Sequence, residues 1–187
     1  MLGYDSTPSE VFLDWRNRFV RVTGTGWSGK TDLMADIVSK MDADEVDILV
    51  YARKDDDEDA LDPRDLFPGA RVEEGVDSFR TALDDMMAPR LAGLTDRPLL
   101  IVAPHVRSAE EAAEDVLRVA RHAEELNAYV LTEDNFGRTL DTLIESFEDV
   151  RYTKLFSNRP EAALRYSKEQ AGTLFRPSVF EGVRVDE

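Results

Sequence analysis

The stretch "RPLLIVAP" (Arg97 to Pro104) limits the folds available to this chain more than any other feature. Its apolar residues follow one another without the polar alternation of a strand that has one face in water. A strand of this kind is buried on both faces, which is typical of a parallel sheet covered by helices on each side. The run "VDILVYAR" (Val46 to Arg53) indicates a second strand of the same type.

Helix-like patterns separate the strand-like runs. The other predicted strands of this region are "RFVRVTG" (Arg18 to Gly24) and "NAYVLT" (Asn127 to Thr132). Apolar residues recur at helical spacing in four segments: Leu33, Met34, Ile37, Val38 and Met41; Phe79, Leu83, Met86, Met87 and Leu91; Ala109, Ala112, Ala113, Val116, Leu117, Ala120, Ala123 and Leu126; and Leu140, Leu143, Ile144 and Phe147. Strands that alternate with helices predict an α/β fold, with a three-layer, mostly parallel sheet and helices on both faces.

A glycine-rich stretch, "GTGWSGKT" (Gly24 to Thr31), joins the first predicted strand to the first predicted helix. It matches the phosphate-loop pattern G-x-x-x-x-G-K-[ST], in which glycines let backbone N–H groups curl inward around a phosphate. The helix that follows adds the positive end of its dipole. The alternative is an ordinary glycine-rich turn with a surface lysine, which binds no phosphate. We predict that ATP and Mg²⁺ are bound here by Gly24, Thr25, Gly26, Trp27, Ser28, Gly29, Lys30 and Thr31.

Three residues of this loop receive more specific predictions. Lys30 is expected to reach the β- and γ-phosphates, and the Thr31 hydroxyl to ligate Mg²⁺. Trp27 is unusual in such a loop, and three roles stay open for it. Its indole could stack on the base, contact a neighbouring subunit or cap the loop.

A phosphate-loop ATPase also needs an acid, usually an aspartate at the end of a buried strand. The expected strand, "LLIVAPH", ends in Ala103, Pro104 and His105 and carries no carboxylate there, which argues against ATP hydrolysis. Two acidic groups could substitute, because each follows a predicted strand: Asp55, Asp56 and Asp57 in "YARKDDDEDA", and Glu133 and Asp134 in "YVLTEDN". The alternatives are a solvated acidic loop for the first group and a helix cap for the second.

The order of these landmarks resembles the RecA/KaiC-type ATPase core. "DILVYARKDD" is similar to the strand that follows the phosphate loop in that family, "PLLIVAPH" to its Walker B strand without the aspartate, and "AYVLTED" to the next strand. "LIESFEDVRYTKL", "ALRYSKE" and "SVFEGVRV" are similar to its later strands. The resemblance implies a RecA-like fold, ATP and Mg²⁺ binding, and assembly into rings or filaments. It assigns Lys30 and Thr31 to phosphate and metal, and Asp55 or Asp56 to the catalytic base.

The same core is shared by DNA-translocating and genome-packaging ATPases of the FtsK/HerA type, which form the second reading. A third is a regulator or scaffold that binds nucleotide without hydrolysing it. For the two readings in which ATP is hydrolysed, the catalytic candidates are Lys30, Asp55, Asp56 and Glu133. The expected organisation is one domain over residues 1–187, with an extension at 1–17, a nucleotide-binding core at 18–150 and a β-rich part of the same sheet at 151–187.

The charge and composition of the chain indicate the environment and the partners to which it is suited. Acidic residues outnumber basic ones by 39 to 23, for a formal net charge of −16, and lysine is scarce beside arginine. The pattern predicts a salt-adapted, cytoplasmic protein, because salt screens the repulsion of such a surface. The alternative is an ordinary acidic protein of a mesophile. The acidic charge also disfavours broad DNA binding, which needs a basic stripe. Cysteine is absent, and no apolar run is long enough to predict a membrane span.

Overall fold

The computed structural model describes residues 3–4, 10–11, 15, 18–23, 30–52, 62–104, 110–133, 148–154, 161–165 and 173–177. The strands are β1 (Gly3–Tyr4), β2 (Glu10–Val11), β3 (Phe19–Thr23), β4 (Asp47–Ala52), β5 (Arg71–Glu74), β6 (Leu99–Ala103), β7 (Ala128–Glu133), β8 (Glu148–Lys154), β9 (Glu161–Arg165) and β10 (Thr173–Pro177). The helices are α1 (Lys30–Ser39), α2 (Pro63–Leu66), α3 (Val76–Leu91) and α4 (Glu110–Arg121).

The strands form one sheet in the order β2-β1-β10-β9-β8-β3-β7-β6-β4-β5. From β8 to β5, every neighbouring pair is parallel. From β8 to β2, every neighbouring pair is antiparallel. The predicted α/β fold with a mostly parallel sheet is therefore confirmed. The described N-terminal strands also join the sheet, because β1 pairs with β10.

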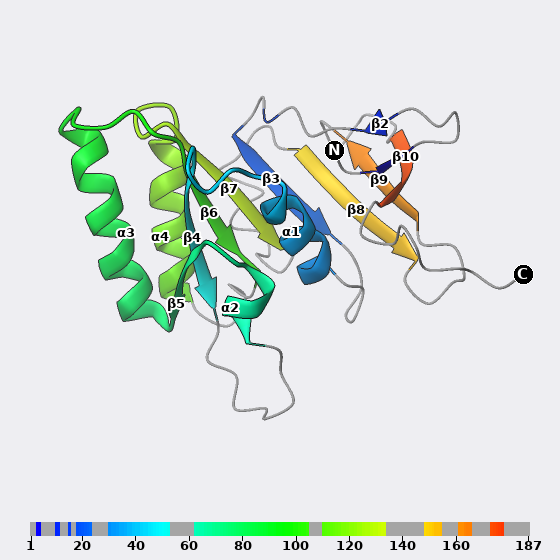
Figure 1. The fold of residues 1–187 in the computed structure, drawn as a ribbon, viewed down its shortest axis with the longest axis horizontal. Helices are drawn as coiled ribbons and strands as arrows, with labels where there is room; N and C mark the ends of the chain where they lie inside the picture. The colour runs from blue at the N-terminus through cyan, green and yellow to red at the C-terminus, as the bar shows by residue number, and fades with distance from the viewer. Residues whose placement is uncertain are drawn as a thin grey trace, which may run out of the picture.

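The faces of the sheet are covered according to the direction in which the chain crosses it. From β3 to β5 the chain moves outward, and α1 and α2 lie on one face; from β5 to β7 it moves back, and α3 and α4 lie on the other (Figure 1). Parallel crossovers are almost always right-handed, so a reversal of direction requires a change of face. Three layers result, with the direction changing at the edge strand β5 and the path returning to β7, beside β3.

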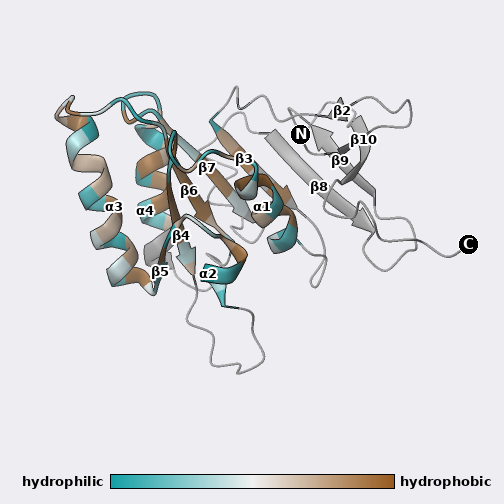
Figure 2. Ribbon diagram, viewed as in Figure 1, coloured by the Kyte–Doolittle hydropathy of each residue, from teal (hydrophilic) through white to brown (hydrophobic). Residues whose placement is uncertain are grey.

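Each buried strand contributes to both faces, as its continuous apolar sequence predicts. Along β6, Leu99 and Ile101 pack with α3 and α4, while Leu100 and Val102 pack with α1. All five residues of this strand are buried. In Figure 2 the strands β4 and β6 are mainly hydrophobic, whereas α1 and α4 carry both hydrophilic and hydrophobic residues. The core is thus divided by the sheet into two apolar clusters.

Some elements differ from the sequence-based expectation. The edge strand β5 was not predicted, because its sequence "RVEE" lacks an apolar run, and neither was the short helix α2. The third helix ends at Arg121, before the predicted Leu126, and turns lead to Asn127, whose φ of 47° does not fit a helix. The predicted helix over Leu140 to Phe147 and the strand "SVFEGVRV" lie outside the described residues.

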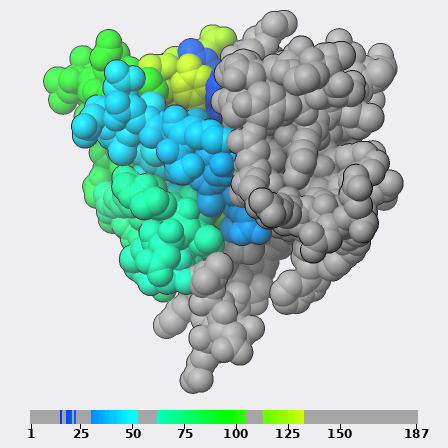
Figure 3. All heavy atoms as spheres, turned by 45° about the vertical axis from the view of Figure 1, so that its right-hand side comes forward, coloured from blue at the N-terminus to red at the C-terminus, as the bar shows by residue number. Residues whose placement is uncertain are grey.

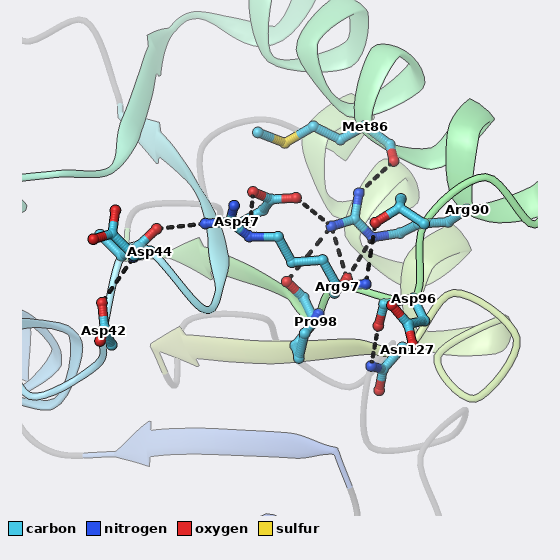
Figure 4. A network of polar contacts seen from close by, with 11 residues as sticks. Asp42, Asp44, Asp47, Met86, Arg90, Asp96, Arg97, Pro98 and Asn127 are labelled. Carbon is cyan, nitrogen blue, oxygen red and sulfur yellow. Dashed lines mark hydrogen bonds and ion pairs between the residues drawn. The ribbon is translucent and has the colours of Figure 1, made fainter.

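A buried arginine at the end of α3 joins the amino ends of the central strands. The Arg90 side chain is 2% exposed and donates hydrogen bonds to the backbone oxygens of Met86 (2.6 Å) and Arg97 (2.9 Å). Its guanidinium also contacts the Asp47 carboxylate at 2.6 Å, at the start of β4 (Figure 4). Arg97 contacts the other oxygen of the same carboxylate at 3.0 Å. Arg90 therefore holds α3, β4 and the segment before β6 together.

We expect Arg90→Met to lower the free energy of unfolding by about 3 kcal/mol, because the buried carbonyls and Asp47 lose a charged donor. Urea unfolding measures the change. The matched control is Arg71→Met, whose side chain is 42% exposed and pairs with Glu73. An exposed pair of this kind contributes about 1 kcal/mol or less. Equal losses in the two variants would show that the Arg90 network has no special role.

Candidate nucleotide-binding site

The carboxyl ends of the parallel strands define the edge of the sheet where a ligand is expected. At this edge β3 ends at Thr23, β4 at Ala52, β6 at Ala103 and β7 at Glu133. The residues from Gly24 to Gly29 connect β3 to α1 and lie outside the described residues. The structure therefore places both flanks of the predicted phosphate loop, and the loop itself stays a prediction.

Lys30 and Thr31 are the first two residues of α1. The helix packs through Leu33 and Met34, both fully buried, into the apolar cluster that also contains Val20 and Val22 of β3. This packing fixes the helix against the strand that precedes the loop. Lys30 itself is buried, with 5% of its surface exposed. The order of strand, glycine-rich connection and buried helix is the arrangement that a phosphate loop requires.

The end of β6 carries no acid, as the sequence indicated. Ala103 and Pro104 are both buried. The neighbouring strand closes this position, because the buried Thr132 hydroxyl of β7 donates a hydrogen bond to the Ala103 backbone oxygen at 3.2 Å. The end of β6 thus has no carboxylate, and the Ala103 backbone oxygen accepts its hydrogen bond from a neutral hydroxyl.

Glu133 is the predicted acid that the described structure brings to the phosphate-loop strand. It is the last residue of β7, and β7 lies between β3 and β6. In the parallel register Glu133 is the partner of Val22, two residues before Gly24. Sequence reasoning placed Glu133 after a strand but did not show that this strand pairs with β3. The other acidic candidates, Asp55, Asp56, Asp57 and Asp134, lie outside the described residues, as does His105.

Sequence reasoning missed one part of this edge. β5 pairs with β4 up to Ala52 and Glu74, and the Gly75 N–H bonds to the Ala52 oxygen at 3.2 Å. Arg64 of α2 contacts Glu74 through a hydrogen bond and an ion pair. The Glu74 carboxylate holds the pKa of the Arg64 guanidinium above its ordinary value, so this residue stays charged. The ion pair between α2 and β5 thus places charged side chains beside the carboxyl end of β4.

Two further properties concern only the described part of the chain. None of its helices is long and apolar enough to cross a membrane. Its histidine, aspartate and glutamate side chains form no group of three or more that could hold a metal ion. Asp55 and Asp56, the candidates for the catalytic base, lie outside this part of the chain.

Comparison with known proteins gives matches in structure only. No protein-family model matches the sequence, and no curated protein matches it either. Among solved structures, the cytoplasmic domain of the type VII secretion ATPase EccC of Thermomonospora curvata is similar, with a TM-score of 0.63 and 14% identity. The match covers 94% of this chain and 25% of that one.

Two more solved structures are similar. A protein described as an ATPase matches with a TM-score of 0.62 and 13% identity, over 94% of this chain and 85% of its own. ATPases 2 and 3 of Thermomonospora curvata EccC, in complex with a signal sequence peptide, match with a TM-score of 0.64 and 12% identity, over 94% and 40%. The chain has the fold of these ATPases. It spans well under half the length of either EccC chain, and identities this low establish the fold alone.

The contact between Thr132 and Ala103 can be tested directly. We expect Thr132→Val to reduce the free energy of unfolding by about 1 kcal/mol, because a buried carbonyl loses its hydroxyl donor. Thr81→Val is the matched control, since the Thr81 hydroxyl also donates to a backbone oxygen, that of Asp77, but at an exposed position. Chemical denaturation of both variants provides the comparison. A loss at Thr81 as large as that at Thr132 would contradict the interpretation.

Proposed function

We propose that this chain binds ATP with Mg²⁺ on the loop from Gly24 to Thr31 and hydrolyses it slowly. The observation that carries the proposal is the position of Lys30, which opens a buried helix directly after the glycine-rich connection from β3. The available groups fit the ligand: a lysine supplies positive charge for the β- and γ-phosphates, and Thr31 supplies the oxygen that Mg²⁺ prefers. The likeness in fold to known ATPases supports it.

Slow hydrolysis follows from the chemistry at the ends of β6 and β7. Phosphate transfer to water needs a group that orients the water and accepts its proton. The end of β6 offers none, since Ala103 and Pro104 occupy it. We propose Glu133 for this role, because its strand pairs with β3 next to the loop. Asp55 and Asp56 remain the alternative acids. If neither Glu133 nor Asp55 nor Asp56 acts as the base, the chain binds ATP without hydrolysing it and serves as a regulator or scaffold.

The similar solved structures support the second reading of the sequence, a motor ATPase of the FtsK/HerA type. The similar structures include secretion ATPases and one that holds a signal sequence peptide. A second candidate function is therefore an ATP-driven motor domain of the FtsK/HerA type, acting on a macromolecule. The net charge of −16 favours a polypeptide substrate over DNA. We also propose that the chain assembles into a ring or filament. The net charge of −16 supports adaptation to a salt-rich cytoplasm.

The nucleotide site is tested with two lysines of one helix. Lys30→Ala removes the predicted phosphate contact, and we expect ATP affinity to fall by about 100-fold or more, corresponding to about 2.7 kcal/mol. The control is Lys40→Ala, because Lys40 lies just beyond the other end of α1 and pairs with Asp36 on the surface. Calorimetric titration with ATP and Mg²⁺ measures both. Unchanged affinity in Lys30→Ala, with the protein still folded by circular dichroism, would refute the proposed site.

The acid is tested by phosphate release. We expect turnover in the wild type to lie far below about 1 s⁻¹, the lower range of ordinary enzymes. Glu133→Gln keeps the size of the side chain and removes its charge, so release should fall by about tenfold or more while ATP affinity is retained. The control is Glu125→Gln, on an exposed turn that precedes β7. A Glu133→Gln rate equal to that of the wild type would transfer the role to Asp55 or Asp56.

A further inference from the structure

A cavity of about 250 Å³ lies at the amino ends of the central strands, opposite the proposed nucleotide site. Its lining comes from segments far apart in the sequence: Trp15 before β3, Met41 and Asp42 after α1, Val46 before β4, Pro98 and Leu100 at β6, and Tyr129 of β7. Figure 3 shows this part of the surface, where the dark blue, cyan and yellow-green segments of the chain meet. Every lining side chain except Asp42 is apolar or aromatic.

The aromatic wall of this cavity is held in place by specific contacts. The rings of Trp15 and Tyr129 meet edge to face, with centroids 5.8 Å apart and planes at 86°. The Arg18 guanidinium lies 4.8 Å from the centre of the Tyr129 ring and bonds to the Asn127 side-chain oxygen at 3.0 Å. Both aromatic side chains are therefore oriented before any ligand arrives. A preorganised wall lowers the entropic cost of binding.

The size of the cavity sets the size of its ligand. An apolar cavity of about 150 Å³ in another protein holds benzene. The cavity in this chain measures about 250 Å³, which suits a body of two fused rings or a similar branched group. Edge-to-face aromatic contacts and the Met41 thioether favour a ring over an open chain.

Asp42 is the one charged side chain among the described residues of the lining, and it favours a positively charged group on the ligand; the Arg18 guanidinium lies against the Tyr129 ring and is not part of the lining. Asp42 lines the cavity and is exposed, and Asp44 and Glu45 follow on the same exposed turn. The Asp42 carboxylate accepts the Asp44 N–H at 2.8 Å, which fixes its position. Among the described residues, none of these three acids forms an ion pair with a basic side chain. The nearby Asp47 carboxylate differs, because Arg90 and Arg97 already neutralise it.

We propose that this cavity binds a small organic cation: an aromatic body of about two fused rings that carries an ammonium group. The rings fill the space between Trp15, Tyr129 and Met41, and the ammonium group pairs with Asp42 at the rim. An anion of the same shape is disfavoured by the acidic turn. The proposal does not depend on ATP binding, because no lining residue belongs to the nucleotide site.

Three probes of one shape test the proposal on the full chain by calorimetric titration: tryptamine, indole and indole-3-propionate. We expect tryptamine to bind with a dissociation constant of about 1 mM or below, and about fivefold more tightly than indole. Indole-3-propionate should bind more weakly than indole. The preference for tryptamine should shrink between about 0.1 M and 1 M KCl, because salt screens an exposed ion pair. Equal affinities for the three probes, or no binding at all, would overturn the proposal.

Two variants separate the charge from the space. Asp42→Asn keeps an oxygen for the Asp44 N–H, and it should remove the preference for tryptamine while leaving indole binding within about twofold. Asp44→Asn, on the same turn but outside the lining, is the matched control and should keep most of the preference. Val46→Phe fills the cavity and should weaken all three probes by about tenfold. A preference that survives Asp42→Asn, or binding that survives Val46→Phe in the folded protein, would contradict the assignment.

Discussion

The reversal of chain direction at the edge strand β5 is the constraint on which the rest of this structure depends. Since parallel crossovers are right-handed, the outward path through α1 and the return path through α3 and α4 must cover opposite faces. β3 then lies between β8 and β7, with parallel partners on both sides. Phe19, Val20 and Val22 of this strand are buried, so its ends are the parts that a ligand can reach. The two candidate ligand sites accordingly lie at the two edges of the sheet.

The two edges have different chemistry for reasons that are local. At the carboxyl edge, helix α1 begins with Lys30 and Thr31, and the positive end of its dipole lies there. At the amino edge, the end of α1 and the starts of β4, β6 and β7 meet. Here the Arg90 network satisfies the polar groups on the α3 side, while the apolar cavity lies on the α1 side. The same strand ends therefore border a hydrogen-bonded arginine on the α3 face of the sheet and an apolar cavity on the α1 face.

Much of the fold could be predicted from the sequence, because burial on both faces leaves a clear pattern. "LLIVA" is continuous and apolar, and the structure buries every one of its residues. β5 left no such pattern: it is an edge strand, and its charged residues reach water. The strand order was equally hidden. That β7 enters between β3 and β6 is a matter of tertiary pairing, and the position of Glu133 beside Val22 of β3 follows only from it. The cavity depends on Trp15 and Tyr129, which no local pattern connects.

The proposed nucleotide site and the cavity lie at opposite ends of one strand and helix pair. α1 runs from Lys30 to Ser39, ten residues, or about 15 Å. Such proximity creates no coupling by itself, because a ligand shifts another site only if it binds two arrangements of the protein differently. β3 has parallel partners on both sides, and Val20, Val22, Leu33 and Met34 are fully buried between it and α1. Close packing of this kind opposes a displacement of the helix relative to the strand. The two sites should therefore bind independently, although they share the same two elements.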